Sequence, residues 1–280
     1  MDEKHVKVIS EDKILHINTG VVVTPELYEK LWSECKNRDY KKFYDKLNED
    51  YNCDIYKAKD FIDNVALKLQ ICYKHKGSRM LYLHGFVLYA ALTNYIKNHP
   101  EIKELVIVET GTARGFSSIC MGKVLYDNNV SGKIYTFDTF PNDKKMWWNC
   151  IDDFKGKHTM KELVLPWKEI QEKYIVYING RTNITLPNLL KEKGRIHFSF
   201  LDAQHDYTNL KFELDSIKEK QESGDIIVCD DYTFFNNGTP QYPGIQQALD
   251  EFIKNKIYDG KIYFGKTDRK NRGYAVLNKK

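Results

Sequence analysis

Short apolar segments alternate with amphipathic segments from about residue 80 to the end of the chain, and this alternation limits the possible fold. The strand-like runs are residues 104–110, 133–140, 173–178, 196–203 and 225–232. Segments with helical spacing separate most of them, and this order is typical of parallel strands joined by right-handed crossovers. The pattern therefore predicts an α/β fold with a doubly wound, mostly parallel sheet. Residues 261–278 contain two further strand-like runs around a polar turn, which predict a closing antiparallel hairpin.

The first part of the chain has a different character. Helical spacing is present over residues 26–36 and 59–74, whereas strand-like runs are few apart from a possible hairpin at residues 5–17. We therefore expect a mainly helical extension at residues 1–79 and one α/β domain at residues 80–280. The extension is expected either to cover the site where the domain binds its substrate or to form a contact in a homo-oligomer.

Composition narrows the range of partners and compartments. The net charge of +4 comes from 43 basic and 39 acidic residues, so it gives no indication of nucleic-acid binding. The first residues, MDEKHVKVISEDK, are charged and contain no apolar run, so we expect neither a signal peptide nor a membrane span. The 6 cysteines are widely separated without a C-x-x-C pair, which favours free thiols and a reducing, cytoplasmic setting.

A glycine-containing loop, ETGTARG, follows the first strand of the α/β domain at residues 109–115. Gly111 allows a tight turn, Gly115 allows close helix packing, and the free amides of the following helix favour an electron-rich ligand. Asp138 ends the next strand, where a doubly wound fold places an acid for ribose hydroxyls. Together they predict a nucleoside-containing cofactor. The alternatives are an ordinary βα turn for the glycines and a capping or turn role for Asp138.

Carboxylates end two further strands, at Asp202 and at the pair Asp230 and Asp231. Parallel strand ends can meet at one sheet edge, where three carboxylates would suit a hard cation such as Mg²⁺. Asp230 and Asp231 converge only if the strand ends there, because adjacent strand residues point to opposite faces. The alternative is that the carboxylates cap the next helices. His205 follows Asp202 closely and is a candidate proton acceptor near neutral pH.

Two aromatic segments are expected on the acceptor side or at a subunit contact. They are the insert at residues 141–167 and the loop at residues 234–244. Trp147, Trp148 and Tyr242 could stack on the face of a sugar. The alternative is that they form the packed underside of a lid.

These segments together resemble class I S-adenosylmethionine-dependent methyltransferases, especially the macrocin-O-methyltransferase-like branch that acts on sugars and small molecules. The resemblance covers about residues 80–280 and rests on VIVETGTARGFSS, YTFDTF, LDAQHDY, and VCDDY followed by PGIQQALDEF. It implies a seven-stranded Rossmann-like sheet with S-adenosylmethionine as cofactor. The implied reaction is metal-dependent methylation of a hydroxyl on a sugar, a glycan precursor or another polar small metabolite.

By position, the resemblance implies three groups of residues: for the cofactor Glu109, Gly111, Gly115, Ser117, Asp138 and Arg181; for Mg²⁺ Asp202, Asp230 and Asp231; and for catalysis His205 and Asp202. The chain departs from the branch at Gln204, where these enzymes often carry an acid. Either His205 accepts the proton, or the metal-bound oxygen loses it without a side-chain base. Two other functions stay open: a nucleotide-cofactor oxidoreductase or hydroxylase-associated relative, which the missing G-x-G-x-x-G disfavours, and a catalytically silent binding protein.

Overall fold

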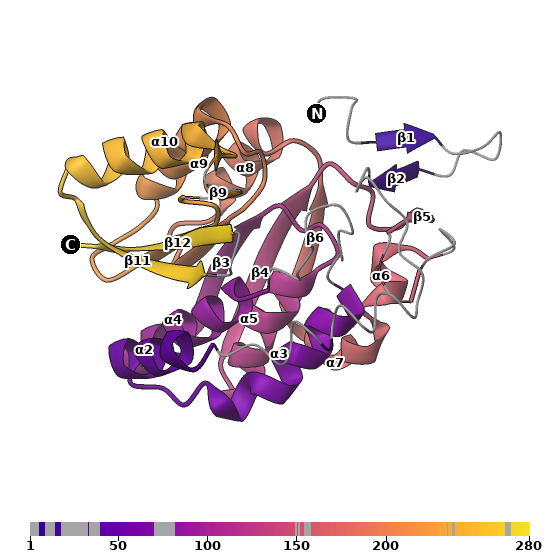
Figure 1. The fold of residues 1–280 in the computed structure, drawn as a ribbon, viewed down its shortest axis with the longest axis horizontal. Helices are drawn as coiled ribbons and strands as arrows, with labels where there is room; N and C mark the ends of the chain where they lie inside the picture. Colours follow the sequence, from indigo (N-terminus) through magenta and orange to yellow (C-terminus); the bar gives the residue numbers. More distant parts are fainter. Residues whose placement is uncertain are drawn as a thin grey trace.

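A mixed β-sheet forms the centre of the computed structural model (Figure 1). The structure describes residues 6–8, 15–17, 33, 40–69, 82–148, 150, 152–153, 158–233, 235–236, 239–266 and 270–280. The seven longer strands of the sheet are β3 (Glu104–Thr110), β4 (Ser131–Asp138), β6 (Ile175–Asn179), β7 (Phe198–Leu201), β8 (Ile226–Cys229), β11 (Tyr258–Lys266) and β12 (Lys270–Lys279). Two short strands, β9 (Phe235–Asn236) and β10 (Thr239–Pro240), extend the sheet beside β12.

The strand order agrees with the doubly wound pattern. Along the sheet the strands follow the order β12-β8-β7-β3-β4-β6, with β11 paired to β12. Strands β3, β4, β6, β7 and β8 run parallel, whereas β11 and β12 form the antiparallel hairpin expected near the end of the chain. All residues of β7 and β8 are buried, as in central strands covered on both faces. The predicted fold class is therefore confirmed.

Helices cover both faces of the sheet (Figure 1). One face carries α4 (His84–Asn98), α5 (Phe116–Asp127) and α7 (Lys168–Tyr174), and the other carries α8 (Thr182–Glu192), α9 (Tyr207–Lys218) and α10 (Pro243–Lys254). Helix α10 shows how the sequence directs this packing. Its buried residues Ile245, Ala248, Leu249 and Phe252 recur at helical spacing and form one apolar stripe.

The described part of the extension is mainly helical, as predicted, and its helices share the core of the α/β domain. Helix α2 (Lys41–Tyr51) packs on α4, and α3 (Tyr56–Leu69) packs on α4 and α5. The rings of Tyr44 and Phe86 lie 4.7 Å apart at this contact. Asp50 ties α2 to β11, because its carboxylate pairs with Lys261 at 2.5 Å and accepts a hydrogen bond from Tyr263. The predicted boundary between residues 79 and 80 lies outside the described residues and stays a prediction.

A second, small sheet joins the start of the chain to the insert at residues 141–167. Strands β1 (Val6–Val8) and β2 (Leu15–Ile17) form the expected antiparallel hairpin, and β5 (Met146–Trp147) pairs with β2 in parallel. This link between distant segments was not predicted. The insert continues with α6 (Met160–Leu163), whose capping box joins Thr159 and Glu162, and with the 3₁₀ helix η3 (Leu165–Trp167).

No helix in the described part of the chain is long and apolar enough to cross a membrane. Four cysteines of the described residues are free thiols: Cys53, Cys120, Cys150 and Cys229. Cys120 and Cys229 are buried, in keeping with their apolar sequence context.

A substitution on α2 tests whether the extension and the α/β domain unfold together. Leu47 has 0% exposure, so Leu47→Ala should lower the free energy of unfolding by about 2–5 kcal/mol through cavity formation. Chemical denaturation followed by circular dichroism and tryptophan fluorescence should give one shared transition. The control Leu165→Ala, at a side chain that is 54% exposed, should change the free energy of unfolding by less than about 0.5 kcal/mol. If unfolding instead shows two transitions, and Leu47→Ala shifts only the earlier one, the extension folds independently of the α/β domain.

Candidate functional site

Four parallel strands end level with one another, and their following loops share one edge of the sheet. Thr110 of β3 pairs with Phe137 of β4 and with Leu201 of β7, and Leu201 pairs in turn with Cys229 of β8. This register places the glycine loop, Asp138, Asp202 and the Asp230–Asp231 pair on the carboxyl edge, where open α/β sheets bind ligands. The edge is the candidate active site.

The glycine loop approaches the loop after β7 so closely that only glycine fits at residue 111. Gly111 has a φ of +90°, and a Cβ built on it would lie 2.1 Å from the carbonyl oxygen of Asp202. Gly115 has a φ of +83° at the N-cap of α5, where a Cβ would lie 3.2 Å from a methyl group of Val164. The tight turn expected from this sequence is therefore present, and it also brings the loop after β3 into contact with the loop after β7.

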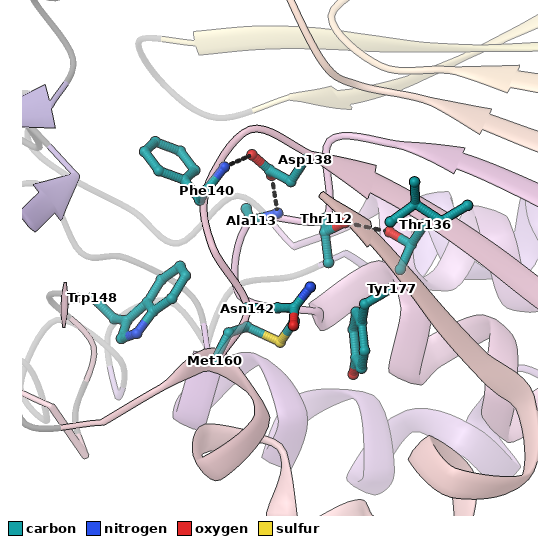
Figure 2. A pocket seen from close by; sticks show the side chains of 10 residues that line it. Thr112, Ala113, Thr136, Asp138, Phe140, Asn142, Trp148, Met160 and Tyr177 are labelled. Carbon is teal, nitrogen blue, oxygen red and sulfur yellow. Dashed lines mark hydrogen bonds between the residues drawn. The ribbon is translucent and has the colours of Figure 1, made fainter. Parts of the chain in front are cut away.

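A pocket lies beside the glycine loop, between the ends of β4 and β6 and the insert (Figure 2). Its lining residues are Thr112, Ala113, Thr136, Asp138, Phe140, Asn142, Trp148, Met160, Tyr177 and Ile178. Aromatic and apolar walls with a few polar groups suit the base and ribose of a nucleoside. Of the residues predicted to hold the cofactor, Asp138 lines this pocket.

Asp138 also organises the loops around the pocket. Its carboxylate oxygens accept hydrogen bonds from the backbone amides of Ala113 at 2.7 Å and Phe140 at 2.8 Å. Burial raises the pKa of Asp138, and these amide hydrogen bonds oppose the rise. The turn role considered for this residue is thus present together with its position in the pocket. The backbone amide of Thr139 also donates to this carboxylate, whose four lone pairs leave room for a ribose hydroxyl.

The insert forms one wall of this pocket. Trp148 is fully buried, its backbone amide donates to Asp153, and its indole N–H donates to the backbone carbonyl of His158 at 3.0 Å. Arg114 of the glycine loop donates to the Trp148 carbonyl at 2.7 Å. Trp148 therefore packs as part of a wall, whereas the side chain of Trp147 lies outside the described residues.

Three other predicted cofactor residues lie elsewhere. Glu109 has 0% exposure and accepts hydrogen bonds from the hydroxyls of Ser117 and Ser118 behind the glycine loop. Burial raises the pKa of Glu109 to about 7, although hydrogen bonds from these serines and Thr136 oppose the rise. Arg181 is exposed at the N-cap of α8. The contacts predicted between the cofactor and Glu109, Ser117 or Arg181 stay predictions.

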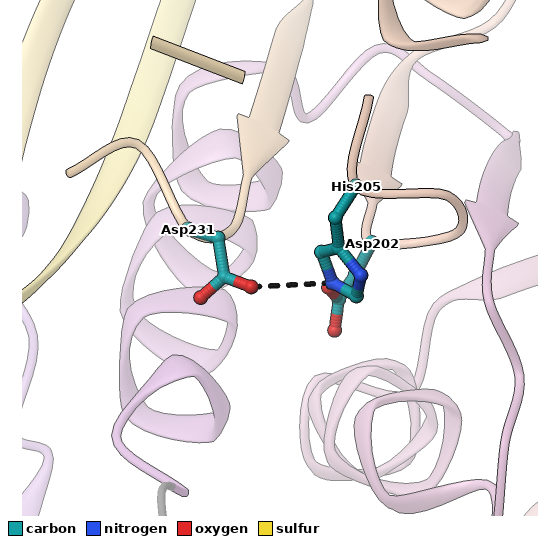
Figure 3. A group of neighbouring side chains, drawn as sticks. All are labelled: Asp202, His205 and Asp231. Atoms are coloured by element: carbon teal, nitrogen blue, oxygen red, sulfur yellow. Dashed lines mark hydrogen bonds and ion pairs between the residues drawn. The ribbon is translucent and has the colours of Figure 1, made fainter. Parts of the chain in front are cut away.

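A carboxylate–imidazole cluster occupies the other side of the edge (Figure 3). The possible ligand atoms of Asp202, His205 and Asp231 all lie within 4.8 Å of one another. His205 Nε2 lies 3.2 Å from Asp202 Oδ1 and 3.2 Å from Asp231 Oδ2. Strand β8 ends at Cys229, and Asp231 has a φ of +57°. The chain therefore turns at the aspartate pair, which is the condition stated above for the carboxylates to converge.

The carboxylate of Asp230 lies outside this cluster because it pairs with Arg272 of β12. Arg272 donates from Nε to Asp230 Oδ1 at 2.7 Å and from Nη2 to Oδ2 at 2.5 Å. The Nε atom also lies 2.6 Å from Asp231 Oδ1. The structure thus brings Asp202 and Asp231 together, with His205 in place of Asp230. Asp230 as a metal ligand stays a prediction.

His205 is positively charged in this arrangement. Partial burial alone would lower the pKa of His205, but hydrogen bonds to Asp202 and Asp231 and their negative charges raise it to about 10. The ring of Tyr242 stacks on the imidazole at 4.4 Å. His205 can therefore act as a proton acceptor only after another cation takes its place between the two carboxylates.

The cluster has the donor set of a divalent-cation site. Asp202 Oδ1 and Asp231 Oδ2 face the same imidazole nitrogen, and the Asp202 side chain is 22% exposed. Carboxylate oxygens suit Mg²⁺ and Mn²⁺, and an imidazole nitrogen adds preference for transition metals. The residues present therefore fit a divalent cation at Asp202 and Asp231.

Behind Asp202 lies a second pocket, whose most distinctive group is Glu213. Glu213 is 2% exposed and accepts a hydrogen bond from the Thr110 hydroxyl at 2.9 Å. Burial raises the pKa of Glu213 to about 7, opposed by hydrogen bonds from Thr182 and Thr110. Sequence reasoning missed this residue because a glutamate within a charged helix is ordinarily exposed.

Alanine at position 111 should disturb both halves of the site at once. A Cβ at 2.1 Å from the Asp202 carbonyl oxygen forces the loops apart, and the positive φ adds backbone strain. Gly111→Ala should therefore lower the free energy of unfolding by about 2 kcal/mol or more. Gly194→Ala is the matched control because nothing lies within 4 Å of its added Cβ. Equal unfolding midpoints for the two variants in urea would contradict the close loop contact.

Glu109 should make the folded state less stable as the pH rises. Its carboxyl group is protonated in the folded state up to a pKa of about 7, whereas the ordinary value is 4.5, so stability is lost as the pH rises between these values. Glu109→Gln should reduce the difference in unfolding free energy between about pH 5 and about pH 8 by ~2 kcal/mol. Glu49→Gln, on the exposed side of α2, is the control. An unchanged pH profile in Glu109→Gln would contradict the burial of a neutral carboxyl group.

Comparisons with known proteins agree with this geometry. Residues 108–232 match the family model described as a methyltransferase domain. The sequence has no match among curated proteins. The Bacillus cereus O-methyltransferase solved with SAH is 13% identical, with 80% of this chain and 90% of that chain covered and a TM-score of 0.51.

Two further solved structures have the same fold. TomG, an O-methyltransferase of Streptomyces achromogenes from tomaymycin synthesis solved with SAM, is 13% identical, with coverage of 85% and 99% and a TM-score of 0.52. The TDP-rhamnose 3′-O-methyltransferase CalS11 of calicheamicin biosynthesis is 17% identical, with coverage of 92% and 96% and a TM-score of 0.52. The chain thus has the fold of these solved O-methyltransferases, and residues 108–232 match the model of a methyltransferase domain.

Proposed function

We propose that this protein is an S-adenosylmethionine-dependent O-methyltransferase that methylates a hydroxyl of a sugar or another polar small metabolite. One observation carries the proposal. A pocket that suits a nucleoside and a carboxylate–imidazole cluster lie on one sheet edge, joined by the contact between Gly111 and Asp202. Methyl transfer needs this arrangement, because the cofactor sulfur and the acceptor oxygen must face each other across one methyl group.

The cofactor half is assigned to the pocket beside Asp138. The Asp138 carboxylate would accept hydrogen bonds from the ribose hydroxyls, and the aromatic and apolar walls would hold adenine. By the resemblance, Glu109, Gly111 and Gly115 would line the methionine and ribose side. SAH and SAM in two of the similar structures support this choice of cofactor.

The acceptor half is assigned to Asp202, His205 and Asp231. Asp202 and Asp231 would hold a divalent cation such as Mg²⁺. When bound, such a cation lowers the pKa of an acceptor hydroxyl and orients its oxygen toward the sulfonium methyl group. The acceptor oxygen then forms a bond to the methyl carbon as the carbon–sulfur bond breaks, and the hydroxyl proton leaves to a base. His205 is the side chain placed to accept it, because the neighbouring Gln204 carries an amide.

A polar, sugar-like acceptor is favoured by the surroundings of His205. Tyr242 covers the imidazole ring and is only partly buried, so it offers a flat aromatic surface next to the carboxylates. Such a surface suits the apolar face of a sugar ring, while the carboxylates suit its hydroxyls. The TDP-rhamnose methyltransferase among the similar structures supports this class of acceptor.

The cofactor assignment predicts that one variant loses affinity for the cofactor and that a second variant keeps it. Asp138→Asn should weaken S-adenosylmethionine binding by about tenfold or more, because hydrogen bonds to a charged group contribute ~1.5–3 kcal/mol. His205→Gln should bind the cofactor as the wild type does, because His205 lies on the acceptor side. Isothermal titration calorimetry measures both, with circular dichroism to confirm folding.

Equal affinities for wild type and Asp138→Asn would contradict the assigned cofactor pocket. Methyl transfer itself is tested with methyl-labelled S-adenosylmethionine and a panel of nucleotide-linked sugars, with Mg²⁺ or with a chelator. Methyl transfer that is unaffected by the chelator would show that the reaction needs no divalent cation. Binding of S-adenosylmethionine without methyl transfer to any acceptor would favour a catalytically silent protein.

A further inference from the structure

Arg272 reaches the candidate active site from the far end of the chain. Strand β12 pairs antiparallel with β8, with Ala275 opposite Cys229, so the residues before Ala275 pass beside those after Cys229. The backbone amide of Tyr232 donates to the Gly273 carbonyl at 2.9 Å and continues this contact past the end of β8. Arg272 is therefore fixed next to Asp230 and Asp231 by the closing hairpin.

The Arg272–Asp230 pair is buried and doubly hydrogen-bonded. The Asp230 side chain has 0% exposure and that of Arg272 has 11%. The guanidinium uses two N–H groups on the two carboxylate oxygens, which is the geometry that distinguishes arginine from lysine. Separating such a pair leaves an uncompensated charge in the interior, and this is strongly destabilising.

The two neighbouring carboxylates consequently point to different partners. Asp230 Oδ1 accepts from Arg272 and from the backbone amide of Asp231 at 2.6 Å, and Asp230 Oδ2 accepts from Arg272. Asp231, after the turn in the left-handed region, directs Oδ2 at His205, while its Oδ1 lies 2.6 Å from Arg272 Nε. Asp231 Oδ2 thus faces the cluster, whereas Arg272 engages both oxygens of Asp230.

We infer that Asp230 and Arg272 form a permanent internal ion pair that positions Asp231, and that the carboxylate ligands of the cation are Asp202 and Asp231 without Asp230. The inference rests on the proposed function, because it concerns the cation assigned there. It replaces a ligand set of three carboxylates with two, and it leaves His205 as the proton acceptor. Asp230 is a positioning residue that acts through Arg272 and Asp231.

Binding of Mn²⁺ to the full-length protein, followed by the electron paramagnetic resonance signal of the free ion, tests the ligand set without cofactor or acceptor. Asp231→Asn should weaken Mn²⁺ binding by about tenfold or more, because a ligand is lost. Asp230→Asn should also weaken it, because Arg272 is left with Asp231 as its carboxylate partner. The double variant Asp230→Asn/Arg272→Gln should recover affinity to within about threefold of wild type, because it leaves no unpaired charge.

A double variant that binds Mn²⁺ as weakly as Asp231→Asn would overturn the inference, because Asp230 would then be a ligand.

Unfolding gives an independent test of the pair. Asp230→Asn and Arg272→Gln should each lower the unfolding midpoint, and the double variant should lower it by less than their sum, whereas additive effects would overturn the pair. A wild-type protein that binds no Mn²⁺ would overturn the cation of the proposed function and this ligand set together. If the wild-type protein binds Mn²⁺ but the double variant does not recover affinity, the ligand set alone is overturned.

Discussion

The backbone of Gly111 lies against the backbone of Asp202, and the site depends on this contact. The loop that carries Gly111 follows β3 and begins the pocket beside Asp138, whereas the loop that carries Asp202 follows β7 and begins the carboxylate–imidazole cluster. Asp202 donates its amide to the Thr110 carbonyl at 3.0 Å, and Gly111 donates its amide to the Phe137 carbonyl at 2.8 Å. The end of β3 is therefore hydrogen-bonded to the end of β4 and to the loop after β7, and these contacts link the proposed cofactor and acceptor halves.

Charge compensation is the second constraint on this edge. Asp202, Asp230 and Asp231 are close enough to repel one another, and two of them are buried, so the fold has to supply positive charge. Arg272 supplies it to Asp230 and Asp231, and His205 supplies it to Asp202 and Asp231. The two cations differ in exposure. Arg272 is held inside the hairpin contact, whereas His205 is 36% exposed and lies beneath Tyr242. Exchange with an external cation is therefore easier at His205 than at Arg272.

Much of the fold followed from the sequence because each parallel strand is a short apolar run bounded by polar residues. That pattern is local, and so is the tight turn expected at Gly111, where the structure has a positive φ. The end of β8 just before the aspartate pair was also a local feature. The register among parallel strands then placed the predicted carboxylates on one edge, as the doubly wound fold requires.

The features that escaped prediction depend on contacts between distant segments. Arg272 reaches Asp230 only through the antiparallel register of β12 with β8, and nothing near either residue in the sequence indicates it. The direction of Asp230 depends on the backbone turn at Asp231. The buried position of Glu213 depends on which face of α9 meets the sheet, and the wall made by Trp148 depends on the path of the insert. A basic residue in the closing hairpin, opposite an aspartate pair at a strand end, is the signal that could have identified Arg272.

A crystal structure of the protein with SAH and Mn²⁺, with the metal located by anomalous scattering, tests the central claim most directly. The claim is that one sheet edge holds the cofactor beside Asp138 and the acceptor at the neighbouring cluster. The account predicts adenosine between Asp138 and the pocket walls, and one Mn²⁺ peak between Asp202 and Asp231 with Asp230 still paired to Arg272. Cofactor density away from Asp138, or a metal peak away from Asp202 and Asp231, would contradict it.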